Sequence, residues 1–298
     1  MVNDKKQGLI AGLILGDALG ARYEGGIPER LYWKFVGKTR DGRYRYTDDT
    51  EMSLALGEAL LESKNVSQEQ LALHFANSVS KHRGYGLGTK KALKLIKKGV
   101  SWHDAARWQY PDGSKGNGAA MRAPVLAVAF NDESIDMLFQ QVKRTSEVTH
   151  AHNDAIVCAQ LIALTCRLGL LSRTNQEILT ELYRLSGEFY ARIEQVDMLL
   201  TEMSNGCLIS RSRIKDVLGN GVLANESVFT AIFYALSYRD SDITSMLTCI
   251  ARLGGDTDTI GSMAGAVYGS INGITKFPDD IVRLAENSEV IIEKLSRL

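Results

Sequence analysis

Two stretches, one near each end of the chain, carry glycine at every fourth position. The glycines are Gly8, Gly12, Gly16 and Gly20 in the first stretch, and Gly261, Gly265, Gly269 and Gly273 in the second. This spacing places glycines along one face of an α-helix. Because glycine inside a helix costs about 1 kcal/mol relative to alanine, a repeated glycine face indicates close approach of another backbone. We expect the two helices to pack against each other or against a shared neighbour; chance spacing is the alternative.

The rest of the chain also follows helical periodicity. Eight further segments alternate apolar and polar residues at helical spacing: 51–61, 68–79, 90–98, 154–170, 176–192, 227–236, 243–252 and 280–298. No run with a period of two ends in a tight hairpin turn, and none of the four prolines need interrupt a long helix. We predict an all-α fold, with roughly ten or more helices in a single compact domain that spans residues 1–298.

Charge and hydrophobicity narrow the class of protein. The 298 residues are 45% hydrophobic and 23% charged, as in an ordinary globular protein, and 35 basic residues balance 35 acidic ones. Without a basic surplus we expect no nucleic-acid partner. The apolar run at residues 8–15 is too short to span a membrane. We therefore expect a buried first helix, no membrane association and, by default, a monomer.

The four cysteines bear on the redox compartment. Cys158, Cys166, Cys207 and Cys249 form no Cys-x-x-Cys pair, and none has a histidine at zinc-binding spacing. Each stands in an apolar, helix-like segment. We expect reduced core cysteines in a cytoplasmic protein.

Two short acidic clusters lie near opposite ends of the chain. The first reads Thr47-Asp48-Asp49-Thr50 and the second reads Gly254-Gly255-Asp256-Thr257-Asp258-Thr259, each at the predicted start of a helix. Neighbouring carboxylates repel, and their burial is costly unless a cation or hydrogen-bond donors compensate. Carboxylate and hydroxyl oxygens are the ligands that suit Mg²⁺, Ca²⁺ and Mn²⁺. If the fold brings the clusters together, they could hold a pair of divalent cations.

Each acidic feature has an alternative interpretation. Helix capping is the alternative for the first cluster, since Asp48 and Glu51 have capping-box spacing, although capping alone requires only one acidic residue. An EF-hand calcium loop is excluded for the second cluster, because Ile260 and Val267 stand where oxygen ligands are needed. Glu24, just after the first glycine helix, is a third acidic candidate; a surface glutamate is its alternative.

Glycine-rich loops are the candidate ligand-binding segments. Residues 113–122 run into a predicted helix, whose N-terminal N–H groups attract anions. This loop lacks the Walker pattern, so it suggests a phosphate or pyrophosphate cradle, with an ordinary turn as the alternative. In a second loop, residues 83–88, Tyr85 could border a ligand. His150 and His152 are too poorly spaced for one helical metal face, which favours ligand hydrogen bonding or capping.

Five segments taken together resemble a known family. In chain order they are Gly16-Asp17-Ala18-Leu19-Gly20, Tyr46-Thr47-Asp48-Asp49-Thr50, Gly116-Asn117-Gly118-Ala119-Ala120-Met121-Arg122, Thr149-His150 and Gly254-Gly255-Asp256-Thr257-Asp258-Thr259-Ile260. Their order and spacing are similar to those of the ADP-ribosylglycohydrolase family, which includes the dinitrogenase-reductase-activating glycohydrolases and the animal ADP-ribosyl-acceptor hydrolases. The resemblance runs from Gly8 to Gly269, nearly the whole chain.

The resemblance implies a compact all-α domain with a binuclear Mg²⁺ centre in a cleft, Mn²⁺ being the alternative cation. Carried over position by position, the metal ligands would be Thr47, Asp48, Asp49, Asp256, Asp258 and Thr259. The substrate-binding residues would be Gly113, Ser114, Gly116 and Asn117 at the pyrophosphate, His150 at a ribose, and Tyr85 near the ligand. The candidate catalytic residues are Glu24, Asp49 and Asp258.

The implied activity is hydrolysis of the glycosidic bond between ADP-ribose and an arginine or serine side chain, which reverses mono-ADP-ribosylation. The expected partner is an ADP-ribosylated protein or a small molecule that contains ADP-ribose. Three alternatives remain open: a hydrolase of a small metabolite such as O-acetyl-ADP-ribose, a non-catalytic ADP-ribose-binding protein, and a purely structural helical protein. Contacts to the leaving group come from variable loops, so the sequence leaves the linkage open.

Overall fold

The computed structural model describes residues 2–278 and 280–298 and confirms the all-α fold. Within that part of the chain no β-strand forms, and only isolated bridges occur. The α-helices are α1 Val2–Gly20, α2 Ile27–Val36, α3 Asp48–Glu62, α4 Gln68–Ser78, α5 Leu87–Lys97, α6 Trp102–Arg107, α7 Ala123–Ala129, α8 Ile135–Glu147, α9 Asn153–Leu170, α10 Asn175–Leu185, α11 Tyr190–Ser204, α12 Arg211–Leu218, α13 Ala224–Ser237, α14 Ile243–Leu253, α15 Thr257–Asn272 and α16 Ser288–Leu295. The short 3₁₀ helices are η1 Ala21–Tyr23, η2 Asn117–Ala119, η3 Gly187–Phe189, η4 Ile274–Lys276 and η5 Val282–Leu284.

The two glycine-faced helices, α1 and α15, pack against each other, backbone to backbone. A Cβ atom at Gly12 would overlap the carbonyl oxygen of Gly265, and one at Gly16 would overlap that of Gly261. At one end of the pair, a Cβ at Gly8 would lie 2.6 Å from the carbonyl oxygen of Gly269. Because residue numbers rise along one helix as they fall along the other, the pair is antiparallel. Of the two arrangements that the glycine pattern predicted, the structure shows the direct contact, between segments some 250 positions apart in the chain, rather than contact with a shared neighbour.

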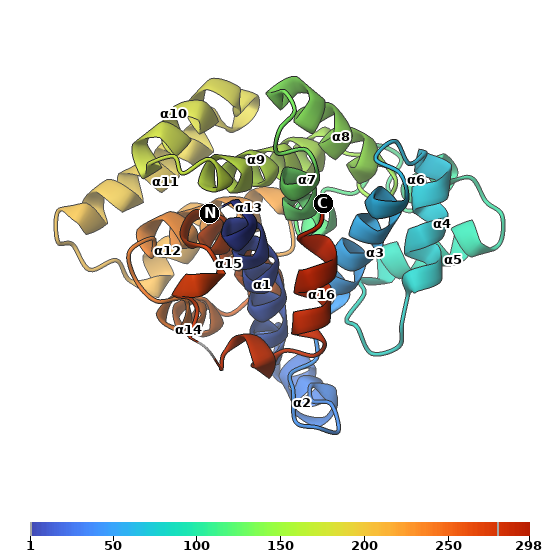
Figure 1. Cartoon of the computed structure of the whole chain (residues 1–298), viewed down its shortest axis with the longest axis horizontal. Helices are drawn as coiled ribbons and strands as arrows, with labels where there is room; N and C mark the ends of the chain where they lie inside the picture. Colours follow the sequence, from blue (N-terminus) through green and yellow to red (C-terminus); the bar gives the residue numbers. More distant parts are fainter. Residues whose placement is uncertain (1, 279) are drawn as a thin grey trace.

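The α1–α15 pair lies at the centre of the fold, and other helices surround it. Figure 1 shows α1 near the middle of the molecule, with α16 beside it. Helices α3 to α6 lie on one side, α10 to α12 lie on the other, and α2 projects at the end of α1. Most of α1 and nearly all of α15 are buried. The C-terminal end of α1 and the N-terminal end of α15 consequently meet inside the protein rather than at its surface.

Helix α9 is long and apolar enough to cross a membrane by length and composition alone. In the structure, however, 72% of that stretch is buried within the protein. It packs against α7, α8, α13 and α15. Packing inside the domain therefore accounts for its apolar character.

The predicted helix 176–192 is wrong as a single element. It is divided into α10 and α11 by a short 3₁₀ turn. Gly187 in this turn has a φ of 55°, in the left-handed region that a continuing helix does not use. Apolar spacing continues across the break, so periodicity alone did not reveal it.

The predicted helix 280–298 is also too long, because only α16 forms a regular α-helix there. The backbone before it pairs with a distant residue instead. The Tyr44 amide donates to the carbonyl of Leu284 at 2.7 Å, and the Glu286 amide donates to the carbonyl of Tyr44 at 2.9 Å. A local pattern cannot reveal such a partner.

The prediction of core cysteines fails at one position. Cys158 and Cys166 are buried and Cys249 is half-buried, whereas Cys207 is exposed.

Candidate active site

The junction of α1, α3 and α15 brings the two acidic clusters together. Asp17, near the end of α1, is fully buried and accepts hydrogen bonds from the backbone amides of Thr47 and Thr50, both at 2.9 Å. The Thr50 hydroxyl donates to the same carboxylate at 2.5 Å. At the other helix, the Thr257 hydroxyl donates to the carbonyl of Gly20 at 2.9 Å. The end of α1 therefore fixes the first turn of both α3 and α15.

Side chains of the two clusters are in direct contact. The Thr259 hydroxyl donates to Asp49 Oδ2 at 3.3 Å, and the Thr47 hydroxyl donates to the same oxygen at 3.2 Å. Carboxylate oxygens of Glu24, Asp256 and Asp258 lie within 4.8 Å of one another. Glu24, considered above for a catalytic role, is therefore also placed where a metal ligand could be.

A tight glycine turn positions the second cluster. Gly254 and Gly255 have φ values of 72° and 80°, which favour glycine strongly. The Gly25 amide donates to the carbonyl of Gly255 at 3.0 Å, which ties the Glu24 segment to this turn. The Asp256 amide donates to the carbonyl of Asn220 at 2.9 Å. Asn220 thus supports the turn, although no motif in the sequence singled it out.

Burial raises the pKa of every carboxyl group in this cluster, and repulsion from neighbouring carboxylates adds to the rise for Glu24, Asp48, Asp49 and Asp258. Burial, followed by the charge of Asp256, raises the pKa of Glu24 to about 7. Burial, followed by the charges of Asp17 and Asp48, holds the pKa of Asp49 well above its ordinary value. Burial, followed by the charge of Glu24, does the same for Asp258. A cation bound at this cluster would therefore favour the ionised carboxylates.

The donor set fits a hard divalent cation. Within the described residues, Asp49 Oδ1 and Asp258 Oδ1 are buried oxygens without a hydrogen-bond donor. Unpaired buried carboxylate oxygens are costly, and their pKa values rise unless a cation approaches. Carboxylates supplemented by threonine hydroxyls are the kind of oxygen ligands that Mg²⁺ and Mn²⁺ accept. The side chains of this cluster are therefore suited to metal binding, as their sequence pattern predicted.

The cluster forms the floor of an open cleft of about 430 Å³. Glu24, Asp48, Asp49, Asp256, Asp258 and Thr259 line one part of it. The remaining wall comes from two glycine-rich loops and the residues near them. These residues are Gly84, Gly86, Leu87, Gly88, Thr89, Gln109, Tyr110, Ser114, Gly116, Asn117, Gly118, Met121, His150 and Val222.

Asn117 links the glycine-rich loop to the acidic floor. Its amide nitrogen donates to Asp256 Oδ2 at 2.5 Å and to the Ser227 hydroxyl at 3.0 Å. A backbone hydrogen bond also holds the loop in place: the amide of Asn117 donates to the carbonyl of Val222 at 3.0 Å. Ser114 accepts from the amide of Gly116 at 3.2 Å. This geometry keeps Ser114, Gly116 and Asn117 at the cleft wall.

His150 forms part of the same wall as a neutral imidazole. Burial, followed by the charge of Arg122, lowers the pKa of His150 to about 3. Its Nδ1 atom lies 2.8 Å from the Thr149 hydroxyl. Gly118 packs against the ring, where a Cβ would lie 2.5 Å from His150 Cε1. A neutral imidazole can donate or accept a hydrogen bond with a ligand, and it adds no positive charge to the cleft wall.

Three predicted site residues do not line the cleft. Thr47 is fully buried and caps α3. Gly113, with a φ of 91°, packs against the backbone of Ala151 and His152. Tyr85 is turned into the protein, where its hydroxyl donates to Glu51 at 2.7 Å. The structure therefore gives Tyr85 a protein partner, whereas the sequence suggested a ligand contact.

Trp33 is a site residue that sequence reasoning missed. Its indole N–H donates to Glu24 Oε2 at 3.0 Å, and its side chain is buried. It lies on α2, the helix after Glu24. The available sequence signal was a tryptophan nine positions after an acidic candidate, which by itself indicates nothing about a shared site.

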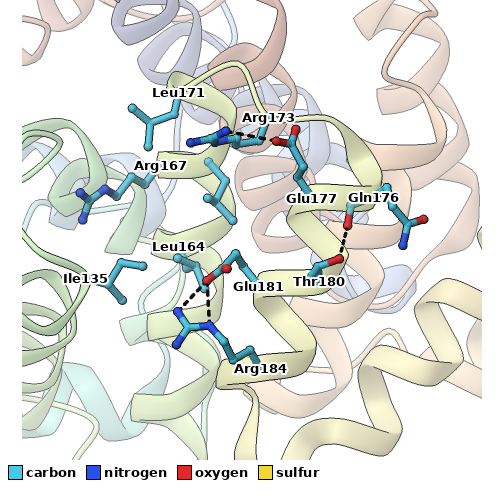
Figure 2. Close-up of a pocket in the computed structure, with 11 residues that line it drawn as sticks. Ile135, Leu164, Arg167, Leu171, Arg173, Gln176, Glu177, Thr180, Glu181 and Arg184 are labelled. Atoms are coloured by element: carbon cyan, nitrogen blue, oxygen red, sulfur yellow. Dashed lines mark hydrogen bonds and ion pairs between the residues drawn. The ribbon is translucent and has the colours of Figure 1, made fainter.

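A second hollow, of about 510 Å³, lies between α8, α9 and α10. Figure 2 shows that charged side chains at this pocket bind one another: Arg173 pairs with Glu177 at 3.1 Å and Arg184 pairs with Glu181 at 2.7 Å. Leucine and isoleucine side chains also line this pocket. Because its acidic groups are already neutralised by arginines, this pocket has no group of unpaired carboxylates comparable to the cleft. The cleft is therefore the candidate active site.

Comparison with known proteins assigns the chain to a class. A model of the ADP-ribosylglycohydrolase family matches residues 2–298. The chain belongs to the ADP-ribosylglycohydrolase family, as the sequence motifs indicated, and this membership supports a hydrolase that releases ADP-ribose.

Several individual proteins are similar over nearly the whole chain. The human and mouse proteins named ADP-ribosylhydrolase ARH3 are each 30% identical over 98% of this chain, which corresponds to 93% and 91% of their own lengths. The uncharacterized protein YegU of Escherichia coli K12 is 27% identical over 92% of this chain and 89% of its own. A solved structure described as an ADP-ribosylglycohydrolase-related protein complex aligns with a TM-score of 0.69 and 21% identity, covering 99% of this chain and 96% of the other. That structural match supports the fold.

Proposed function

We propose that this protein is a Mg²⁺-dependent hydrolase that cleaves the glycosidic bond between ADP-ribose and an arginine or serine side chain, and so reverses mono-ADP-ribosylation. The observation that carries the proposal is the meeting of unpaired buried carboxylate oxygens and a glycine-rich loop at one cleft. The carboxylate oxygens are suited to cations, and the glycine-rich loop is suited to a pyrophosphate. ADP-ribose contains both a pyrophosphate and ribose hydroxyls that a cation can bind.

The metal ligands in this proposal are Asp48, Asp49, Asp256, Asp258 and Thr259, with Thr47 supporting Asp49. These residues would hold two Mg²⁺ ions. The positive charge supplied there would orient the hydroxyls of the distal ribose and stabilise negative charge that develops during the reaction. Ser114, Gly116 and Asn117 would receive the pyrophosphate, and His150 would bond a ribose.

The remaining chemistry is attack of water at the anomeric carbon. Glycoside cleavage passes through an oxocarbenium-like transition state, and a carboxylate must take a proton from the attacking water. Glu24 is placed for this transfer, because it lines the cleft and its carboxylate lies within 4.8 Å of those of Asp256 and Asp258. Asp49 or Asp258 is the alternative proton acceptor.

Loss of a carboxylate tests the proposal directly. Asp49→Asn and Asp258→Asn each keep the side-chain shape but remove a charged oxygen ligand. We expect release of ADP-ribose from a modified protein to fall by more than the roughly 100-fold that loss of a supporting residue costs at metal sites. The circular dichroism spectrum should stay unchanged.

The matched control is Asp240→Asn, at an exposed aspartate after α13. It should release ADP-ribose at the wild-type rate. Wild-type turnover in both site variants would rule out the proposed centre. Tight ADP-ribose binding by the wild type, without turnover, would instead favour a binding protein.

A further inference from the structure

One buried arginine, Arg83, connects segments of the chain that lie far apart in sequence. Arg83 Nη1 donates to the carbonyl of Tyr46 at 2.8 Å and to Glu286 Oε2 at 2.7 Å. Its guanidinium carbon lies 3.8 Å from the centre of the Tyr46 ring. Its Nε atom is 3.6 Å from Glu51 Oε1. Arg83 does not line the cleft, so neither substrate nor metal contacts it directly.

The backbone of Arg83 also binds the acidic loop. Its carbonyl accepts a hydrogen bond from the Asp48 amide at 2.6 Å. Arg83 therefore bonds the residue before Thr47 through its side chain and the residue after Thr47 through its backbone. Together with Asp17, which accepts from the Thr47 amide, it leaves the Tyr46–Asp48 backbone little freedom to shift.

The residues that directly follow Arg83 lead into the cleft wall. Gly84 follows Arg83 directly with a φ of 79°, and a Cβ there would lie 3.6 Å from Asp48 Oδ1. Tyr85 then donates to Glu51 at 2.7 Å, and Glu51 also accepts from the Ser80 amide at 3.0 Å. Gly86 to Thr89 follow as part of the wall. Glu51, which follows the acidic motif without an evident role in it, thus anchors the segment that contains Ser80 and Tyr85.

We propose that Arg83 is a positioning residue that holds the Asp48 segment where cation binding needs it and joins that segment to the 84–89 wall, with Glu286 and Glu51 holding its guanidinium. The proposal rests on the hydrolase function proposed above. A guanidinium is suited to this task, because its planar fork can bond several acceptors at once, whereas an ammonium group cannot reproduce that geometry.

The test is Arg83→Lys, which keeps the charge and loses the fork, with the Mg²⁺ dissociation constant measured by calorimetry. We expect the dissociation constant to rise about 10- to 100-fold, as when supporting residues of metal sites are replaced. Saturating Mg²⁺ should restore part of the rate at which Arg83→Lys releases ADP-ribose. Glu286→Gln, which keeps an acceptor for Arg83 but removes its charge, should give a smaller rise.

A matched control separates positioning from loss of stability. Arg239 also bonds two acceptors, Asn175 Oδ1 and the Arg173 carbonyl, both at 2.8 Å, but far from the cleft. Arg239→Lys should lower the melting temperature and leave the Mg²⁺ dissociation constant unchanged. Wild-type Mg²⁺ affinity in both Arg83→Lys and Glu286→Gln would overturn the positioning role while the hydrolase proposal stands. Absence of Mg²⁺ binding by the wild-type protein would overturn the hydrolase proposal itself.

Discussion

At the scale of single residues, the candidate site is a set of carboxylates whose charges are not balanced by the protein. Asp17 is the exception, since the backbone amides of Thr47 and Thr50 and the Thr50 hydroxyl all donate to its carboxylate. Asp49 and Asp258 each keep one buried oxygen without a donor. This difference separates the structural acid from the candidate metal ligands, although all three are aspartates at helix ends.

The raised pKa of Glu24 predicts how stability depends on pH in metal-free protein. Its ordinary pKa is 4.5 and its folded-state pKa is about 7, so the folded state binds more protons than the unfolded chain between these values. The free energy of unfolding should therefore fall as pH rises through this window, by at most about 1.4 kcal/mol per pH unit for each such group. Thermal melts from pH 4.5 to pH 7.5, in chelator, measure this slope.

Glu24→Gln removes one of the contributing groups, so its slope should be shallower than that of the wild type. Saturating Mg²⁺ favours the ionised carboxylates and should reverse the sign of the slope in the wild type. Identical slopes for wild type and Glu24→Gln in chelator would contradict the assignment of the raised pKa to this residue.

At the scale of elements, the glycine faces of α1 and α15 determine where the site forms. Their backbones approach so closely that Gly12 and Gly265 leave no room for a methyl group. This contact brings the end of α1, with Asp17, against the first turn of α15, with Asp258. A wider separation of the helices would move the two acidic clusters apart, so packing and the candidate site depend on the same glycines.

Gly12→Ala should therefore destabilise the protein, although alanine favours a helix by about 1 kcal/mol over glycine. The methyl group would overlap the Gly265 carbonyl, which is backbone and cannot rotate away. Overpacking of this kind costs about 1–3 kcal/mol, or more where the backbone is rigid. A lower midpoint in urea denaturation measures the loss.

Gly57→Ala in α3 is the matched control. There the obstructing atom is the end of the flexible Leu295 side chain, which can change rotamer. This variant should be close to neutral or slightly stabilised. Equal destabilisation in the two variants would show that the α1–α15 contact is not the constraint inferred here.

At the scale of the whole molecule, the sequence predicted the helical class, and it favoured close approach of the two glycine-faced segments, either to each other or to a shared neighbour. Glycine spacing and acidic motifs are local patterns with direct physical meaning. The sequence did not predict the loop that pairs Tyr44 with residues 284–286, nor the bond from Trp33 to Glu24. Both depend on partners brought close only by folding. Tyr85 illustrates the same limit, since a glycine loop suggested a ligand contact and the fold supplied Glu51 instead.

The central claim is that the cleft hydrolyses an ADP-ribosyl linkage with the help of a divalent cation. The most direct measurement is release of ADP-ribose from two matched peptides, one modified on arginine and one on serine, each with Mg²⁺ and with chelator. We expect release from at least one peptide with Mg²⁺ and little or none with chelator, and the peptide that reacts identifies the linkage. No release from either peptide, by protein that binds ADP-ribose in calorimetry, would contradict the claim and leave a binding protein or a hydrolase of small ADP-ribosyl metabolites.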